Sequence, residues 1–590
     1  MFRYLGLLWN AEFATASEAA VNLQRRILEL SPRWKRVFRG GGVAVLTADC
    51  SRHWCARPLF GNRGVVLGEI FPQLDPSGQG GPVQGAQFAE KDTQALIDSR
   101  GRALISRYWG NYVALLLDGN RDGRYVIKDP CGSLPCHFLE IDGVILLFSC
   151  LEDCRELRLR IQVNWEFVRA RIAAGPQEVR EPSLRGVSTI HRGECVCIDR
   201  EAKLQSRMQY WQPDFASADL VEPEVARRAM RGAVLASTQS MAAGHLSVLA
   251  QVSGGLDSSI VLGCLSAGLS GPAVTCYTFF VPNSVCDERR WARCATTRVG
   301  LEHLEVPLDP KKLLYADLPP LRASVEPPSY FTRWQKGPIE REMAARFGAS
   351  TLFTGEGGDA TFCSTSYVFA VDHCLRRSGL SFQTLRTAAL VATRRGHSFW
   401  NILGKALARQ VFGDSRADRK RSSESLRRLV MSEAPVGPRM NLETLLRMGL
   451  LGVVPSFYDV SASQHEPAPY VASPLCAQPV VELCARIPVD VHFDGGRIRG
   501  LARRAFADLV PQPILGRQWK DRPLLQLSEV TSSNLAFIRE QLLDGALVKQ
   551  GILNRAALEQ ALSGAPSHSR AIGSEILSHL DVELWIRDCA

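Results

Sequence analysis

The stretch VSGGLDSSIV, residues 252–261, places two glycines, an aspartate and three serines between two apolar segments. LSVLAQV (246–252) is typical of a strand, and SSIVLGCLSAGL (258–269) is typical of a helix. Glycine permits positive φ and close backbone approach. Free amides at a helix N-terminus, together with serine hydroxyls, form a cradle for an anion. The order of strand, glycine loop and helix therefore predicts a phosphate-binding turn. The alternative is a serine-glycine helix cap without a functional role.

The chain around this loop alternates between strands and helices. Predicted strands are AVTCYTFF (273–280), EHLEVPL (302–308) and STLFT (350–354), and predicted helices are DERRWARCATTRVG (287–300) and PIEREMAARFG (338–348). Such alternation predicts a parallel sheet covered by helices, with ligands bound beyond the carboxyl ends of its strands.

A second glycine-rich acidic loop, TGEGGDATF (354–362), again follows a predicted strand. Two such loops at one sheet edge favour nucleotide binding over two coincidental caps. Asp257 and Asp359 would share a Mg²⁺ ion that bridges phosphates, because hard oxygen ligands suit that ion. Neither GxxxxGK[ST] nor GxGxxG occurs in these loops, which excludes the Walker loop and the dinucleotide fingerprint.

The first half of the chain has a different rhythm. Short apolar runs lie between turn clusters, and they are GGVAVLTAD (41–49), RGVVLGEIF (63–71), NYVALLLDG (111–119), RYVIKD (124–129) and GVILLFS (143–149). This spacing predicts stacked antiparallel sheets. QPDFASADLVEPE (212–224) reads as a linker, so we expect one domain at 1–212 and a second at 222–590.

Composition narrows the class of protein. A chain of 590 residues exceeds one hydrophobic core, and no run of eighteen apolar residues or signal peptide is present, so we expect a cytoplasmic protein without a membrane partner. The net charge of +10 suits ATP or an acidic peptide as well as a nucleic acid, and the basic stretch 393–430 is typical of a solvated helical face. The seventeen cysteines are scattered, so we expect buried free thiols rather than disulfides or a metal site at Cys195 and Cys197.

SGGLDSS resembles the pyrophosphate-binding loop of the N-type ATP pyrophosphatases, and TGEGGD resembles the second loop of the asparagine synthetase family. Three further segments resemble that family in its order, namely DERRWARCATTRVGLEHLEV, SPLCAQPVVELCARIP and RIRGLARRAFADLVPQPILGRQWK. The match covers roughly 225–522. It implies an α/β ATP-pyrophosphatase synthetase domain that uses ATP and Mg²⁺, without nucleic acid.

The resemblance assigns roles by position. The implied catalytic residues are Asp257, Asp359, Lys520 and Glu326, with Asp257 and Asp359 also on the metal. The implied ATP- and pyrophosphate-binding residues are Ser253, Gly254, Gly255, Leu256, Asp257, Ser258, Ser259, Gly355, Glu356, Gly357, Gly358 and Arg499. Arg499 stands where the family usually has lysine, Arg503 matches an arginine, and GRQWKD departs from the usual form around Lys520. Glu326 would be the base, with a structural carboxylate as the alternative.

The first half resembles the family's N-terminal-nucleophile amidase domain, an α+β fold of stacked antiparallel sheets. In that domain a cysteine at position 2 attacks glutamine. Here position 2 is Phe2, and Leu67 replaces the asparagine that stabilises the oxyanion, although Gly68 and Glu69 remain. We therefore expect no glutamine hydrolysis, so the nucleophile for an activated carboxylate comes from elsewhere.

Two branches share this pattern, namely the β-lactam synthetases and the lasso-peptide cyclases. The extra length at 375–440 favours a cyclase, in which Trp334, Phe382, Phe399 and Trp400 line a groove for a precursor peptide, although core packing is the alternative for each ring. A leader peptidase and a leader-recognition protein would be its partners. The alternatives are a small-molecule amide synthetase, an ammonia-dependent asparagine synthetase and a non-catalytic binding protein.

Overall fold

The structure is a computed structural model. It describes residues 1–75, 81–119, 123–131, 134–159, 161–174, 182–211, 219–268, 271–284, 287–317, 324–327, 336–364, 367–412, 468–517, 524–563 and 570–589. Lys520, Trp334 and residues 413–430 of the basic stretch 393–430 lie outside these residues.

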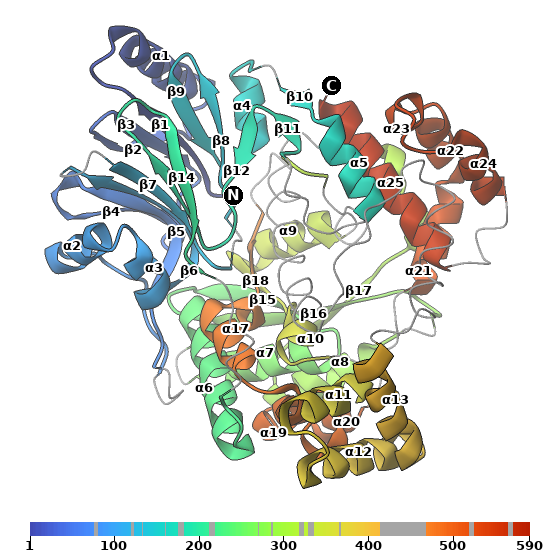
Figure 1. Ribbon diagram of the computed structural model, residues 1–590. Coiled ribbons are helices and arrows are strands. Elements are labelled where there is room, and N and C mark those ends of the chain that lie inside the picture. The colour runs from blue at the N-terminus through green and yellow to red at the C-terminus, as the bar shows by residue number, and fades with distance from the viewer. Residues whose placement is uncertain are drawn as a thin grey trace.

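Two antiparallel sheets stack face to face in the N-terminal part (Figure 1). The first sheet contains, in spatial order, β12 (Val187–Thr189), β8 (His137–Ile141), β9 (Val144–Phe148), β1 (Arg3–Trp9), β3 (Val43–Ala48) and β2 (Lys35–Gly40). The second contains β14 (Leu204–Gln209), β13 (Glu194–Ile198), β7 (Gly123–Lys128), β6 (Tyr108–Asp118), β5 (Gly64–Pro72) and β4 (Cys55–Pro58). A small antiparallel pair, β10 (Gln162–Val163) and β11 (Leu184–Arg185), lies beside them.

The alternation of side chains along β1 shows how these layers form. Tyr4 and Leu8 point into the core between the two sheets, whereas Leu5 and Leu7 face the opposite core. Helix α1 (Ala14–Leu30) packs on that outer face, and α2 (Glu90–Asp98) and α3 (Arg102–Arg107) cover the second sheet. The expected stack of antiparallel sheets is confirmed.

A parallel sheet forms the centre of the second part. Its strands are, in spatial order, β17 (His303–Pro307), β16 (Ala273–Phe280), β15 (Ser247–Gln251), β18 (Thr351–Phe353) and β19 (Tyr470–Ala472). Val248 and Ala250 pack toward α6 (Pro223–Ala242), α7 (Leu256–Ser266) and α8 (Arg289–Val299). Leu249 packs on the other face against α9 (Lys336–Phe347). The predicted parallel α/β sheet is confirmed, and both of its faces are buried.

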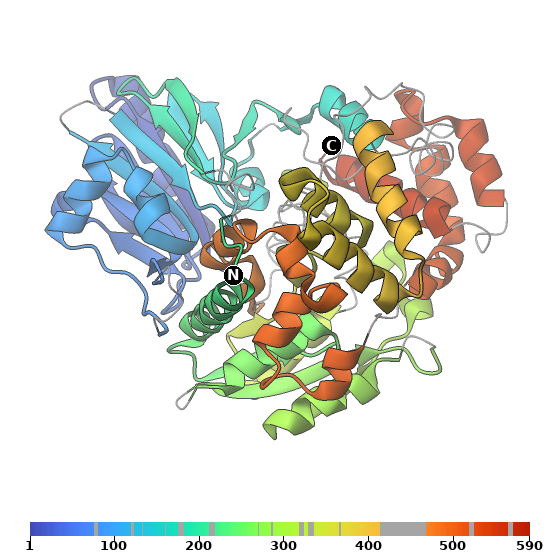
Figure 2. The ribbon, with the colours of Figure 1, turned by 60° about the horizontal axis from the view of Figure 1, so that its bottom comes forward.

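A helical layer enters the chain between β18 and β19. It begins with α10 (Gly358–Thr361), α11 (Tyr367–Ser378), α12 (Phe382–Arg395) and α13 (Phe399–Phe412). Val371, Ala388 and Ile402 of the last three helices share a small core of their own. Figure 2 shows these olive to gold helices grouped away from the blue N-terminal sheets.

The chain ends in further helices. They are α17 (Gln478–Ala485), α18 (Val489–His492), α19 (Gly500–Ala505), α20 (Gln512–Gly516), α21 (Leu524–Ser533), α22 (Leu535–Leu543), α23 (Ala546–Lys549), α24 (Arg555–Ser563) and α25 (Arg570–Cys589). Single 3-10 turns occur at η1 (Phe60–Asn62), η2 (Pro310–Lys312), η3 (Tyr315–Asp317), η4 (Pro474–Cys476) and η5 (Asp494–Gly496).

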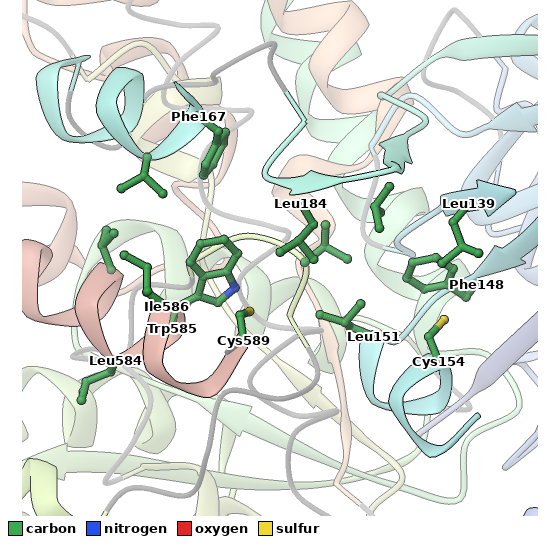
Figure 3. Packing of buried hydrophobic residues seen from close by; sticks show 14 of the residues in the cluster. Leu139, Phe148, Leu151, Cys154, Phe167, Leu184, Leu584, Trp585, Ile586 and Cys589 are labelled. Carbon is green, nitrogen blue, oxygen red and sulfur yellow. The ribbon is translucent and has the colours of Figure 1, made fainter. Parts of the chain in front are cut away.

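Helix α25 returns to the N-terminal part of the chain. Trp585 is fully buried there, and its ring centroid lies 6.3 Å from that of Phe167 in α5 (Trp165–Ala174), as Figure 3 shows. The Arg155 guanidinium of α4 (Leu151–Glu156) donates a 2.7 Å hydrogen bond to the Asp588 carbonyl. Residues at opposite ends of the sequence therefore share one core.

Two expectations from composition concern absent features. All cysteines in the described ranges are free thiols, and Cys195 is buried in β13. Of the helices that the structure describes, none combines the length and the apolar character needed to span a bilayer.

Candidate active site

The first glycine loop lies between β15 and α7, as its sequence predicts. Gly254 has a φ of +69°, and a Cβ at this position would lie 2.5 Å from the Cβ of Trp291. Only glycine fits there, because both the backbone conformation and the neighbouring helix α8 exclude a side chain. Gly255 is the N-cap of α7 and supplies no capping side chain, so the amides of the first turn remain available to an anion.

Serine hydroxyls shape the inside of this loop. Ser258 Oγ accepts from the Ser253 amide at 3.2 Å and lies 3.2 Å from Ser253 Oγ. Ser259 Oγ donates to the Gly255 carbonyl at 2.8 Å. Leu256, by contrast, is buried in the core beneath the loop. The serines hold the turn in shape, and Leu256 anchors it.

The second loop packs directly on the first. A Cβ on Gly355 would lie 2.4 Å from the Ser258 amide nitrogen, and one on Gly358 would lie 2.5 Å from Asp257 Cγ. Gly357 has a φ of +85°, and its α-hydrogen faces Cys476 Sγ, which a Cβ would approach to 2.1 Å. The glycines of TGEGGD are therefore required by contact between the loops as well as by the turn itself.

Arg499 joins the acidic residues of both loops. Its Nη1 lies 2.7 Å from Asp257 Oδ2 and 2.8 Å from Asp359 Oδ1. The side chains of Arg499 and Asp257 are 13% and 17% exposed, whereas that of Asp359 is 75% exposed, so the pair of carboxylates opens toward solvent on one side. Arg499 is the N-cap of α19 and has a positive φ of +56°.

These two carboxylates fit a magnesium ion. They already converge on one positive charge, and Mg²⁺ prefers one or two protein carboxylates together with phosphate oxygens. Asp257 and Asp359 would hold the ion, which would neutralise phosphate charge.

The segment SPLCAQP supports the second loop. Thr354 Oγ1 lies 3.2 Å from Ser473 Oγ, and Thr361 Oγ1 donates to the Leu475 carbonyl at 2.9 Å, which ties SPLCAQP to the second loop. Cys476 Sγ lies 3.6 Å from the Glu356 carbonyl oxygen. The segment therefore forms the wall behind the second loop.

His303 acts on the first loop through Thr278. Its Nε2 lies 2.8 Å from Thr278 Oγ1, which in turn donates to the carbonyl of Val252. Burial lowers the pKa of His303, so the ring is neutral near pH 7. This chain of hydrogen bonds fixes the end of β15, from which the loop departs.

Arg517 is a residue of the site that motif reasoning did not single out. It contacts the Glu288 carboxylate at 2.5 Å, and its Nη1 lies 3.4 Å from the Gly254 carbonyl. Arg517 lies in GRQWKD and Glu288 lies in DERRWA, so each residue of this ion pair stands in a segment that resembles the family. What the motifs do not reveal is that these two segments meet.

Arg503 lies one helical turn after Arg499 and hydrogen-bonds to backbone carbonyls, whereas Glu326 lies near α5. Arg503 donates to the Leu515 carbonyl at 2.6 Å, and burial followed by its arginine neighbours lowers its pKa to about 10. It connects α19 to α20. Glu326 is exposed and lies near Arg171 of α5 on the α25 side of the molecule, where burial lowers the pKa of Arg171 and the Glu326 charge only partly opposes that shift. Its role as a base stays a prediction, as does that of Lys520.

Loops from two neighbouring parallel strands place their carboxylates on one cation at the strands' carboxyl ends, where ligands bind in open α/β sheets. The family model named Asparagine synthase matches residues 229–587. The chain therefore belongs to the asparagine synthase family. The family-level resemblance is confirmed.

No curated protein matches the chain. Among solved structures, a glutamine-dependent NAD⁺ synthetase from Acinetobacter baumannii in complex with ADP is 13% identical, with a TM-score of 0.18, and the match covers 42% of this chain and 51% of that one. The chain thus spans about half the length of that synthetase.

Two further structures are similar over longer stretches. The allosteric regulatory enzyme of purine biosynthesis is 10% identical with a TM-score of 0.22, over 60% of this chain and 89% of its own. A glutamine PRPP amidotransferase from B. subtilis with ADP and GMP is 12% identical with a TM-score of 0.21, over 61% and 77%. At these values the likenesses imply neither a substrate nor a partner for this chain.

Proposed function

We propose that this protein is a lasso-peptide cyclase. It would adenylate an Asp or Glu side-chain carboxylate of a precursor peptide and join that carbonyl to the peptide's N-terminal amine. The observation that best supports the adenylation step is the contact of Arg499 with both Asp257 and Asp359, which come from the two glycine loops. Membership of the asparagine synthase family supports the use of ATP for amide formation.

The chemistry proceeds in two balanced steps. A carboxylate oxygen of the peptide attacks the α-phosphorus of ATP, a phosphorus–oxygen bond breaks, and pyrophosphate leaves. The amine nitrogen then attacks the acyl carbon, AMP leaves, and a base takes the proton. The α7 N-terminus and the hydroxyls of Ser253 and Ser258 would bind the pyrophosphate portion. Arg499 would exchange its carboxylate contacts for phosphate oxygens once nucleotide and Mg²⁺ are bound.

The N-terminal part supports a nucleophile other than glutamine-derived ammonia. At position 2, where the amidases carry their cysteine, Phe2 is fully buried. Its amide donates to the Tyr470 hydroxyl at 2.6 Å, and Trp54 stacks on the Tyr470 ring at 4.4 Å. Aromatic side chains fill this position and offer no group that attacks an amide.

The helical layer supports a peptide substrate. Phe382 is 82% exposed at the start of α12 and Trp400 is 75% exposed at the start of α13, whereas Phe399 packs against the core of the layer. Large exposed aromatic rings are typical of recognition surfaces, because they offer contact area at low entropic cost. A leader peptidase and a leader-recognition protein remain proposed partners, and a cytoplasmic location remains an expectation.

The test measures pyrophosphate release from Mg-ATP by the purified chain, with the short peptide encoded beside its gene. Peptide-dependent release and a product lighter by one water are the expected results. An N-acetylated copy of the peptide should still release pyrophosphate in the first turnover but form no ring, which separates activation from closure. A Phe382→Ser/Trp400→Ser double variant should raise the KM for peptide, while the KM for ATP stays unchanged.

Other outcomes would replace the proposal. Turnover of aspartate with ammonia would return the protein to asparagine synthesis, and activation of a small carboxylate alone would make it a small-molecule amide synthetase. Absence of ATP affinity would leave only a binding protein.

A further inference from the structure

A histidine–glutamate–histidine cluster lies where the N-terminal sheets meet the parallel-sheet part. His53 comes from the loop between β3 and β4, Glu69 comes from β5, and His245 comes from the turn before β15. One ligand atom from each side chain lies within 4.8 Å of the other two. The three residues are far apart in sequence, so only the packing of the two parts brings them together.

We propose that His53, Glu69 and His245 bind one zinc-class divalent metal ion that ties the two parts of the chain together. Two imidazoles and one carboxylate are a ligand set suited to Zn²⁺, Co²⁺ or Ni²⁺. Three protein ligands leave a further coordination position for water. This inference is independent of the proposed function.

The distances require only a small closure. The His53 and His245 rings stack with centroids 3.9 Å apart, and His53 Nδ1 lies 3.9 Å from Glu69 Oε1. Zinc bonds of about 2 Å place tetrahedral ligand atoms roughly 3.3 Å apart. The two ring planes are only 17° apart, so the rings have to turn about their χ angles before a nitrogen of each can face the same ion.

Hydrogen bonding around the cluster favours ligation. His53 Nδ1 is the ring nitrogen that faces the Glu69 carboxylate, and the Gly244 backbone hydrogen-bonds to the same side chain. His245 Nδ1 lies 2.7 Å from Ser350 Oγ, which orients the ring. A partner on the second ring nitrogen is the usual support of a metal-binding histidine.

The ligand set favours a transition metal over Mg²⁺ or Ca²⁺, because those two ions prefer oxygen ligands whereas imidazole nitrogen suits Zn²⁺, Co²⁺ and Ni²⁺. Burial lowers the pKa of both histidines, that of His245 to about 4, so both rings are neutral near pH 7. Burial raises the pKa of Glu69 to about 7, because the nearby Arg57 and a hydrogen bond from Asn111 only partly offset desolvation.

The neighbouring arginines do not neutralise the carboxylate by contact. Arg57 Nη2 donates to the His53 carbonyl at 3.0 Å, and its Nη1 donates to that of Gly68. Arg52 lowers the pKa of both histidines by repulsion. Because these positive charges oppose a hard cation, binding depends on coordination by imidazole nitrogen.

The experiment titrates Co²⁺ and Zn²⁺ into the full chain after chelator treatment and dialysis. One Co²⁺ per chain is expected, with d–d absorption and without the thiolate bands that cysteine ligation would add. Zn²⁺ should raise the thermal midpoint, because it binds the folded state alone. His245→Gln and Glu69→Gln should each weaken Co²⁺ affinity at least tenfold.

A control variant and a folding check accompany the titration. His397→Gln changes an exposed histidine outside the cluster and should bind Co²⁺ like the unmodified chain. Circular dichroism of each variant reports whether it is folded, and His53→Gln replaces any variant that is not. Binding that is absent from the unmodified chain, or unchanged in folded cluster variants, would overturn the proposal.

Discussion

Arg499 shows how one residue organises the nucleotide site. Its guanidinium bonds to Asp257 and Asp359, although the loops that carry these carboxylates are about a hundred residues apart in sequence. Two carboxylates at such close range repel one another unless a cation lies between them. Arg499 provides that cation and keeps the two carboxylates converged; in the proposed function a metal ion and a nucleotide would take its place.

Replacement of Asp359 separates its chemical role from its structural role. The side chain is 75% exposed, so Asp359→Asn should change the free energy of unfolding by less than about 0.5 kcal/mol. Pyrophosphate release should fall about 10²-fold or more, because charge stabilisation at the phosphates is lost. Asp544→Asn is the matched control, since Asp544 is 74% exposed and also paired with an arginine, Arg555. Full activity of Asp359→Asn would contradict its place in the site.

Gly254 and Gly300 form a matched pair for the cost of a methyl group. Both have a φ of +69°, but a Cβ on Gly300 meets nothing within 4 Å, whereas one on Gly254 would lie 2.5 Å from Trp291 Cβ. Gly300→Ala should cost about 1 kcal/mol from backbone strain alone. Gly254→Ala should cost a further 1–3 kcal/mol or so, because the loop has to shift. Urea unfolding measures both, and equal costs would show that the contact with α8 is unimportant.

At the scale of elements, helix α25 is the clearest case of a segment whose role depends on a distant partner. Its Trp585 is fully buried, and the indole Nε1 donates to the Ser324 carbonyl at 3.2 Å (Figure 3). Val325, next along the chain, packs in the same core, and its carbonyl accepts from Ser183 at 2.9 Å. The helix thus holds the segment that carries Glu326 against the N-terminal part.

Truncation of Trp585 should loosen this arrangement. Trp585→Ala should lower the free energy of unfolding by about 3–5 kcal/mol, because a large cavity remains. Trp585→Phe keeps most of the ring and loses the hydrogen bond to the Ser324 carbonyl, which is worth about 1 kcal/mol, so it should be destabilised less than Trp585→Ala. Chemical denaturation followed by circular dichroism compares the two variants. A loss below about 1 kcal/mol for Trp585→Ala would mean that the site repacks.

For the whole molecule, buried neutral histidines control stability in acid. Burial lowers the pKa of His137 to about 3, and lowers those of His492 and His579 to about 4. Above pH 6.5 the rings are neutral in both states. As pH falls from 6.5 toward 4, the unfolded chain takes up protons that the folded chain cannot, so stability is lost.

The size of this effect is testable at His579. Each buried histidine contributes about 1.4 kcal/mol of lost stability per pH unit below 6.5. His579→Leu should remove one histidine's contribution to the loss of stability per pH unit below pH 6.5, while the slope above pH 7 stays the same. His579 Nδ1 has no hydrogen-bond partner in the described part of the chain, so the substitution breaks no hydrogen bond at that nitrogen. Urea unfolding at a series of pH values measures it. An unchanged slope below pH 6.5 would show that His579 is protonated in the folded state.

Local sequence patterns were enough to predict the fold class, the two glycine loops and the family. These features are local, since a strand, a glycine turn and an amphipathic helix each follow from spacing within about fifteen residues. The loop VSGGLDSSIV lies between β15 and α7 as its pattern predicts. The same reasoning missed β1, because MFRYLGLLWN carries no turn signal beside it, and missed β19, a strand of three residues.

Which distant residues are in contact depends on the tertiary structure. Sequence patterns named Asp257, Asp359 and Arg499 separately, but their contact depends on the crossing of two loops with the N-terminus of α19. Nothing local in the sequence marks His53, Glu69 and His245 as neighbours, because they lie on a loop, a strand and a turn in two parts of the molecule. Such contacts depend on how sheets and helices pack, and packing is set by the whole core rather than by a short stretch of chain.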